Sequence, residues 1–328
     1  MASQSPIHQL KHNNHEKDVC MLVMVMVSMC AMSQSIKVQA KFAKGEYAIY
    51  ESTSTVKIAM PTGESEEVTT KGEIKYEVTD ARSDGYTIAI TTLKWDGDNS
   101  SAGTLGDFSA MQEEMLVGKT IILDTDKDGK VVRIANFDEM KKQMEEMADG
   151  IVDKIFAEVD ASSAPMKKEN IKEVIMGELT EENMLKSAVH SSNQFSLYGK
   201  TIATGTTEDE TVSHMKMKTT YFVLPQKSAD SYTIKSSSVI NMDKEDMKKL
   251  IIDTITKMAP DQADMVKQNI DMLLDSGMMK IEGSRTCTYN MLANGWLQEG
   301  EMTQKTNSMG SESSNTNTWK IKECSWKK

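Results

Sequence analysis

The segment Asp124-Thr125-Asp126-Lys127-Asp128-Gly129 carries carboxylates at alternate positions. In calcium loops of this spacing, alternate oxygen ligands converge on the ion and the glycine allows a sharp turn. The twelfth position of such a loop supplies a bidentate glutamate, whereas Ala135 occupies it here. The pattern therefore indicates either a calcium site at Asp124, Asp126 and Asp128 or, as we favour, a plain hairpin turn between two strands.

Soft metal ligands occur together at His214-Met215-Lys216-Met217, a set that suits copper(I). Strand alternation would place the two methionines on one face and His214 on the other, which favours a structural role. His190 is the other histidine beyond the predicted leader described below. Neither histidine lies near a Gly-x-Ser-x-Gly nucleophile elbow, and no His/Cys cluster has zinc spacing.

The paired carboxylates Glu66-Glu67, Glu113-Glu114 and Glu145-Glu146 are typical of solvated faces. A glycosidase uses two acids that can be distant in the chain, so spacing alone does not exclude a hydrolase. The sequence contains no glycine-rich loop of the kind that holds phosphate. It therefore assigns no catalytic or cofactor-binding residue.

The composition restricts the partners. The chain has 328 residues, a net charge of −11 and 27% charged residues, with a pI near 5.1. Nucleic-acid affinity depends on basic groups that displace counterions, so this charge balance opposes it. The length is sufficient for one large domain or two small ones.

The N-terminus contains an apolar run at 19–32. A membrane-spanning helix needs roughly 20 apolar residues, whereas a signal-peptide core needs about 7–15. The small residues Ala31 and Ser33 are spaced as a cleavage site, and Val38-Gln39-Ala40 forms a second candidate. The pattern predicts a signal peptide at 1–33 and export to the periplasm, the cell surface or the medium; a buried core strand is the alternative.

Lipidation at Cys30 is disfavoured, because the bulky Met29 stands where a lipobox needs a small residue. Cleavage would leave Cys287 and Cys324, and an even pair in an exported chain suggests a disulfide. A three-stranded meander over 279–326 would instead place a strand between them, too far apart for a bond. Both possibilities remain open at this level.

Two hydrophobic periods divide the chain into strands and helices. Alternation predicts strands at 46–60, 66–82, 86–90, 120–123, 131–132, 202–224 and 230–241, and again across the last fifty residues with a turn at Asn294-Gly295. Helical spacing predicts helices at 137–159, 166–178, after Thr180, from Asp243 to about 258, and from Pro260 to about 276.

Methionine is abundant, with 27 in the chain. Two sets recur at helical spacing, namely Met140, Met144 and Met147, and Met258, Met265 and Met272. Such stripes could line a pliable pocket for an apolar ligand, because thioethers repack easily. They are more often ordinary helix cores, which is the interpretation we favour.

An internal echo suggests a weak duplication of a β unit. Tyr76, Val78, Asp84, Tyr86, Thr87 and Ile88 match Tyr221, Val223, Asp230, Tyr232, Thr233 and Ile234. Each copy is followed by a hairpin, the first turning at Asp128-Gly129 and the second at Asn294-Gly295. Generic hairpin composition is the alternative explanation.

The chain also resembles a family of exported, uncharacterised proteins from Bacteroidetes. The matching segments are Tyr76-Glu77-Val78-Thr79, Asp84-Gly85-Tyr86-Thr87-Ile88, Leu116-Val117-Gly118-Lys119, Gly129-Lys130-Val131-Val132, Glu282-Gly283 and Asn294-Gly295-Trp296-Leu297. Where relatives carry a proline-and-glycine entry to the second half, this chain has Leu197-Tyr198-Gly199-Lys200. The resemblance implies an envelope or secreted location and a β-rich fold, and no activity.

Together these patterns predict an α+β architecture of curved antiparallel sheets with amphipathic helices packed against them. We expect a leader at 1–33, a β-rich half with a helix at 34–160, a helical connector at 161–200 and a second β-rich half at 201–328. A non-enzymatic envelope protein that binds an apolar ligand or a protein partner is the favoured function. The alternatives are a glycan or peptide hydrolase and a structural or adhesive surface protein.

Overall fold

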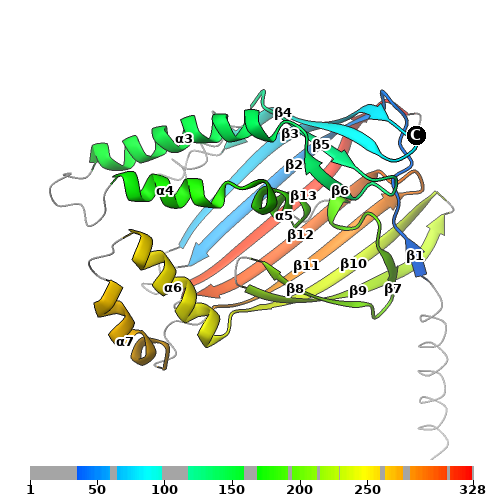
Figure 1. The fold of residues 1–328 in the computed structure, drawn as a ribbon. Helices are drawn as coiled ribbons and strands as arrows, with labels where there is room; N and C mark the ends of the chain where they lie inside the picture. Colours follow the sequence, from blue (N-terminus) through cyan, green and yellow to red (C-terminus); the bar gives the residue numbers. More distant parts are fainter. Residues whose placement is uncertain are drawn as a thin grey trace, which may run out of the picture.

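The computed structural model describes residues 35–59, 65–97, 117–158, 168–190, 194–212, 215–228, 230–258, 263–275, 281–308 and 311–326. The predicted leader lies outside them. The strands are β1 (Ser35–Lys37), β2 (Tyr47–Ala59), β3 (Ser65–Ala81), β4 (Tyr86–Gly97), β5 (Thr120–Thr125), β6 (Val131–Ile134), β7 (Thr201–Ala203), β8 (Thr207–Val212), β9 (Met215–Ser228), β10 (Ser231–Asn241), β11 (Ile281–Leu292), β12 (Leu297–Ser308) and β13 (Ser311–Cys324). The helices are α3 (Phe137–Glu158), α4 (Lys168–Glu178), α5 (Glu181–His190), α6 (Lys244–Met258) and α7 (Ala263–Asp275), with a 3-10 turn η1 (Gln194–Ser196) (Figure 1).

Eleven strands form one open antiparallel sheet in the order β6-β5-β4-β3-β2-β13-β12-β11-β10-β9-β8. Strands β2 to β6 form a meander on one side of the sheet, and strands β8 to β13 form a second meander on the other side. The two meanders meet where β2 pairs with β13, near the centre of the sheet. Each meander alone would end in an edge strand, β2 or β13, with unpaired backbone groups. The pairing of β2 with β13 satisfies these groups. The predicted antiparallel β structure is confirmed, with the strands of both halves joined in a single sheet.

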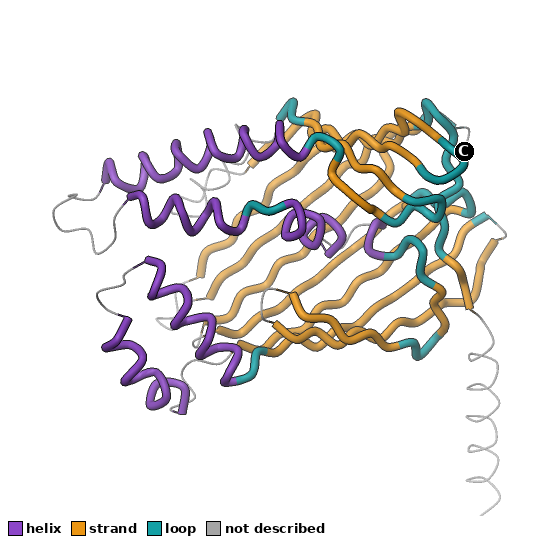
Figure 2. Tube along the Cα trace, viewed as in Figure 1, coloured by secondary structure: helices purple, strands orange, loops and turns teal. Residues whose placement is uncertain are grey.

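The helices lie on one face of the curved sheet, with α3 and α4 side by side across its open side (Figure 2). We call this the inner face and the opposite one the outer face. Two helices begin with a side-chain cap, at the positions where the sequence predicts their start. The Asp243 carboxylate accepts from the Asp246 amide at 2.8 Å, and the Thr180 hydroxyl accepts from the Asn183 amide at 3.2 Å. These side chains satisfy amide groups that the first helical turn leaves without a partner.

The outer face carries a ladder of β-hydroxy residues. Direct cross-strand partners run without a break through Thr69, Thr55, Thr316, Thr303, Thr286, Ser237, Thr220 and Thr207. Threonine combines β-branching, which suits a strand, with a hydroxyl that remains hydrated. Cross-strand pairs of this kind contribute about 0.2–1 kcal/mol each. The strands thus keep their stability where no helix covers them.

Two separate hydrophobic clusters lie on the inner face. The large cluster is rich in aromatic residues: the ring of Trp296 lies 4.5 Å from that of Phe42 and 4.8 Å from that of Trp326, between centroids. The small cluster joins the α6–α7 pair to one end of the sheet and contains Met242, Met247, Ile270 and Leu274.

The prediction for the second methionine stripe was wrong. Met265 and Met272 are 60% and 73% exposed, while Ile270 on the same helix is fully buried. The buried residues of α7 are Ala263, Ile270 and Leu274, and Ile270 and Leu274 share the small cluster with Met247 of α6. In the first stripe, Met140 does pack against the large cluster.

The segments of the internal echo occupy equivalent places in two hairpins. Val78 pairs directly with Ile88 across β3 and β4, and Val223 pairs with Ile234 across β9 and β10. All four residues belong to the large cluster. The duplication itself remains a prediction.

Candidate functional site

A band of polar side chains crosses the inner face of the sheet. Directly paired residues in an antiparallel sheet share a face, so rows can be traced from the register. Two neighbouring rows contain the polar residues Ser54, Thr70, Asn317 and Ser236 in one, and Asn315, Gln304, Arg285, Ser238, Thr219 and Glu208 in the other. We call these ten residues the polar belt.

The polar belt separates the two hydrophobic clusters. On one side, the row from Trp319 through Tyr289, Ile234 and Val223 belongs to the large cluster or packs against it. On the other side, the strand ends reach the small cluster beneath α6 and α7. Along β9 to β11, the floor of the inner face therefore changes from apolar to polar and back to apolar. The first of the two belt rows is mixed, because Met302, Cys287 and Tyr221 of the large cluster lie in it among the polar residues.

Several belt residues hydrogen-bond to one another. Arg285 donates to the Gln304 side-chain oxygen through Nε at 3.0 Å and through Nη2 at 2.8 Å. The hydroxyls of Thr219 and Ser238 lie 2.8 Å apart, and both residues are buried. A buried polar group is costly unless it is paired, so these bonds offset the cost of placing polar side chains on a helix-covered face.

A charged group stands at the β8 end of the belt. Lys200 Nζ lies 2.5 Å from Glu208 Oε2, and the Tyr221 hydroxyl donates to the same oxygen at 3.0 Å. Burial, followed by the negative charge of Glu208, raises the pKa of Tyr221 well above its usual value. The positive charge of Lys200 thus balances the negative charge of Glu208. The Tyr221 hydroxyl stays protonated at physiological pH.

At the β4 side of the inner face, Trp95 lies opposite Gly72. A side chain at Gly72 would place its Cβ 3.0 Å from the Trp95 ring and 3.1 Å from the Ser52 hydroxyl, so glycine makes room for the indole. The Trp95 Nε1 is buried and has no hydrogen-bond partner among the described residues. A buried N–H without an acceptor is rare, because it loses its bond to water.

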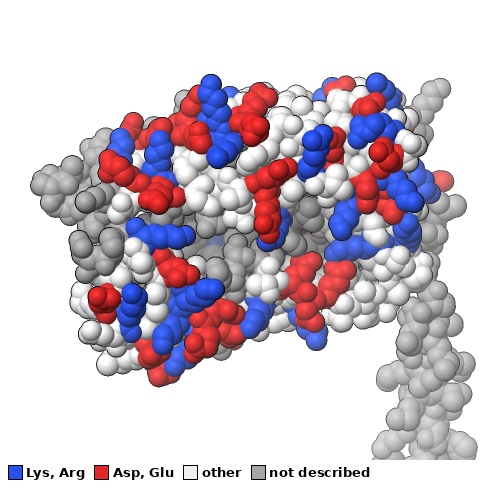
Figure 3. Space-filling model, in the orientation of Figure 1, with Lys and Arg blue, Asp and Glu red and all other residues white. Residues whose placement is uncertain are grey.

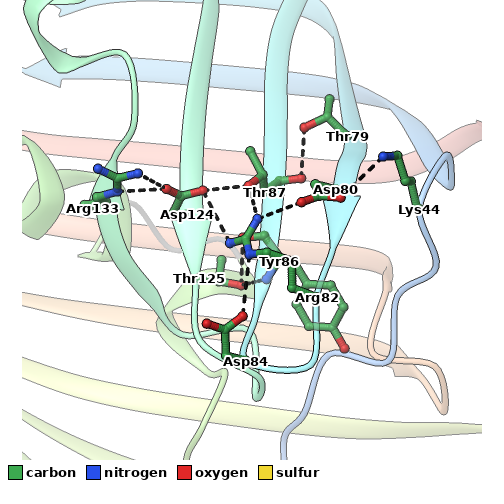
Figure 4. Close-up of polar contacts among 10 residues, drawn as sticks. All are labelled: Lys44, Thr79, Asp80, Arg82, Asp84, Tyr86, Thr87, Asp124, Thr125 and Arg133. Carbon is green, nitrogen blue, oxygen red and sulfur yellow. Dashed lines mark hydrogen bonds and ion pairs between the residues drawn. The ribbon is translucent and has the colours of Figure 1, made fainter.

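The three aspartates of the predicted calcium loop do not converge. Asp124 binds Arg133, with Nη2 at 2.7 Å and Nε at 2.8 Å, and accepts from the Thr87 hydroxyl at 2.6 Å (Figure 4). Asp126 instead accepts from the amides of the turn, and Asp128 forms an ion pair with Lys37 at 2.9 Å. The geometry favours the hairpin turn between β5 and β6. Within the described residues, no group of three or more His, Cys, Asp or Glu could hold a metal ion.

Cys287 and Cys324, for which the sequence left a disulfide open, are free in the structure. Cys287 lies on β11 and Cys324 at the end of β13, with β12 between them. Across the sheet, Cys287 is aligned with Met302 and then with Asn317, far along β13 from Cys324. The intervening strand thus separates the thiols, as the meander alternative anticipated.

The remaining predicted ligands are dispersed. Met215 and Met217 share the inner face, where Met217 is buried and Met215 packs against the small cluster. His190 ends α5, and His214 and Glu113-Glu114 lie outside the described residues. Lys/Arg and Asp/Glu side chains are interspersed on the helix-covered side, with no broad basic area in that view (Figure 3).

Two cavities formed by described residues are lined by neither methionine stripe. One of about 580 Å³ lies at the ends of β2, β11, β12 and β13 and is lined by charged and hydroxyl side chains, among them Lys57, Lys305 and Glu312. Another of about 590 Å³ lies on β8 to β10, where Met217 is the one methionine in its lining. Within the described residues, no helix has the length and apolarity needed to cross a membrane.

The sequence analysis did not predict the polar belt. A weak signal for it exists in Ser311–Thr318, where polar residues occupy both parities of a strand instead of alternating with apolar ones. Both faces of this strand are polar in the structure, with Asn315 and Asn317 on the inner face and Thr316 on the outer.

No protein family model matches the chain, and no curated protein matches it significantly. Among solved structures, lipovitellin, in a structure described for its lipid–protein interactions, is 12% identical with a TM-score of 0.43. The match covers 86% of this chain but 26% of lipovitellin, so the chain spans about a quarter of it.

Two further structures are similar over most of the chain. A Bacteroides fragilis protein, described as exported and with a YmcC-like fold, is 8% identical with a TM-score of 0.25, covering 88% of this chain and 100% of its own. DynF, from the dynemicin biosynthesis pathway of Micromonospora chersina, is 6% identical with a TM-score of 0.20, covering 89% and 86%. At these scores the similarities carry no argument about function.

Proposed function

We propose that this protein is exported to the cell envelope and binds an amphipathic ligand on the inner face of the sheet, beneath the helices, without catalysing a reaction. The observation that carries the proposal is the polar belt between two hydrophobic clusters. Packing alone does not favour polar side chains on a helix-covered face, because each costs free energy there unless it is hydrogen-bonded. A ligand with an apolar body and a polar group would contact a hydrophobic cluster with the first and the polar belt with the second.

The exposure of the belt supports this proposal. Ser54, Asn315, Asn317, Gln304 and Arg285 are half-buried, although they lie on the helix-covered face. The side-chain amides of Asn315, Asn317 and Gln304 can donate to a carboxylate, phosphate or hydroxyl oxygen. The neighbouring Trp319 and Ile74 are also half-buried and offer apolar surface beside the belt. Small-molecule sites combine these two kinds of lining, with few polar groups that orient the ligand.

Export is proposed from the leader-like residues at the N-terminus. The hydrolase alternative lacks a specific observation in its favour, because Glu208 of the inner face is engaged by Lys200 and Tyr221. The adhesive alternative requires an apolar patch. On the described outer face, however, the exposed Val239 and Phe222 pair directly with lysines.

The first test is native mass spectrometry of the mature protein purified from its own envelope. A co-purified amphipathic molecule is the expected result. The second test is titration with pyrene dodecanoic acid, an amphipathic fluorophore, beside pyrene, which lacks the polar group. We expect saturable binding of the acid and weaker binding of pyrene.

A matched pair of variants locates the site. Asn315→Leu with Gln304→Leu alters the inner face, and Thr316→Leu with Thr303→Leu alters the outer face of the same two strands. We expect the inner pair to weaken binding of the acid on the order of fivefold, the value of about one hydrogen bond, and the outer pair to leave it unchanged. If no ligand co-purifies and neither probe binds, or if both pairs behave alike, the proposal is wrong.

A further inference from the structure

The first described segment of the chain is built into the core. We call Ser35–Phe42 the strap. Val38 is fully buried, Ala40 is 3% exposed and Phe42 is 7% exposed, and all three belong to the large cluster. The strap begins as β1, which pairs with β7 in register from Ser35 to Lys37.

Beyond β1, the strap is hydrogen-bonded to three distant segments. The Val38 amide donates to the Lys200 carbonyl at 2.9 Å. The Ala40 amide donates to the Asp128 carbonyl at 2.9 Å, and the next amide, that of Lys41, donates to the Asn294 carbonyl at 3.1 Å. The strap therefore runs between the β5–β6 turn of the first half and the β11–β12 turn of the second.

The two turns approach the strap so closely that each requires glycine. A Cβ on Gly129 would lie 2.6 Å from the Ala40 Cβ, and a Cβ on Gly295 would lie 2.4 Å from the Gln39 carbonyl oxygen. Both glycines also have positive φ angles, of 93° and 92°. The backbone of both turns therefore fits closely against the strap in the folded protein.

We infer that the strap is retained in the mature protein, so that the leader is removed before Ser35 and not at the second candidate site after Ala40. This inference rests on the proposed export. Cleavage after Ala40 would remove β1 and the buried Val38. It would also leave the Lys200 carbonyl, the Asp128 carbonyl and the Gly199 amide without their hydrogen-bond partners. Unpaired buried backbone groups and an emptied core position would both destabilise the fold.

The full chain, expressed with its leader in an exporting bacterial host, provides the first test. Intact mass of the secreted, folded protein should correspond to an N-terminus at or before Ser35. A mature chain that begins at Lys41 would overturn the inference. A chain that keeps the whole leader would overturn the proposed export, and with it the site of cleavage, but not the contacts of the strap.

Glycine variants test those contacts separately. Gly295→Ala clashes with the strap alone, and Gly129→Ala clashes most closely with Ala40 of the strap and also contacts Tyr198. Gly118→Ala and Gly205→Ala share the positive φ but have nothing within 4 Å of the added Cβ. If the mature protein contains the strap, Gly129→Ala and Gly295→Ala should each lower the melting temperature by about 5 °C or more relative to Gly118→Ala and Gly205→Ala. Equal losses in both pairs would show that the turns have no strap against them and would overturn the inference.

Discussion

The Asp124 carboxylate is held by the Arg133 guanidinium at 2.7 and 2.8 Å, on the outer side of the β5–β6 hairpin. Arg82 approaches the same carboxylate at 3.8 Å from the β3–β4 turn. Asp124 is 8% exposed. Asp124, considered in the sequence as a possible calcium ligand, thus joins two hairpins through arginine.

The stability of the protein should depend on Asp124 in the acid range. Burial alone raises the pKa of Asp124, but hydrogen bonds from Thr87 and Arg133 outweigh it, and the pKa lies below its usual value. A lowered pKa stabilises the folded state above the unfolded value of about 3.9, and this contribution disappears as the pH falls through the folded value. Asp124→Asn should cost about 1–2 kcal/mol at pH 7 and flatten the loss of stability below about pH 4.

The control for Asp124 is Asp84→Asn. The Asp84 side chain is 84% exposed, and its distance of 3.5 Å to Arg82 describes a surface pair. Such pairs contribute little. Urea unfolding at a series of pH values measures both variants, and equal pH profiles for the two would contradict the role assigned to Asp124.

Helix α7 should tolerate polar changes on its methionine face and not on its buried face. Met272→Gln is expected to change the free energy of unfolding by less than about 0.5 kcal/mol, because the side chain is 73% exposed and the two residues have similar helix propensity. Ile270→Ala, at a fully buried position, should cost about 2–5 kcal/mol. Thermal unfolding of the two variants measures the difference; a costly Met272→Gln would mean that this methionine is covered.

Calcium should not stabilise the β5–β6 hairpin. Asp124 and Asp128 are occupied by Arg133 and Lys37, and Asp126 caps the backbone of the turn. We expect the melting temperature to be the same with calcium and with a chelator. A bound ion at a hundred times its dissociation constant would add about 2.7 kcal/mol, which calorimetry would detect easily. Such a gain would restore the calcium interpretation.

The two thiols should react independently in the native protein. Cys324 is half-buried and Cys287 is 5% exposed, so an alkylating reagent should modify Cys324 first and Cys287 only on unfolding. A reductant should leave the melting temperature unchanged, whereas loss of a disulfide would cost about 3–4 kcal/mol in the chain-entropy view. Peptide mass mapping after alkylation distinguishes the two cysteines. Protection of both thiols until a reductant is added would indicate that they are bonded.

Local chemistry made the elements themselves predictable. The predicted helix from Asp243 to about 258 corresponds to α6, and the cap at Asp243 is present. The turn residues Gly129 and Gly295 stand where the backbone has positive φ, which glycine adopts without strain. These features depend on side chains and backbone only a few residues apart, so a single sequence contains the information.

The faces of those elements were harder to predict. Met272 and Ile270 are both apolar, and the helical period is compatible with either as the centre of the buried face. Which one is buried depends on where α6 and the end of the sheet lie, and that is set by the rest of the fold. The same holds for Trp95, whose indole occupies the space left by Gly72 on the neighbouring strand.

The sequence alone determined most of the strands, the helices, their caps and the glycine turns, because each arises from interactions between near neighbours in the chain. It did not predict β1. Tertiary structure alone decided that β2 pairs with β13, with Ser52 opposite Trp319, and that Asn315, Gln304 and Arg285 lie side by side on the inner face. Each of these residues is an ordinary polar position within its own strand. The polar belt exists because strand pairing brings such residues into two neighbouring rows. Pairing between distant segments follows from the summed burial and hydrogen bonding of the whole sheet.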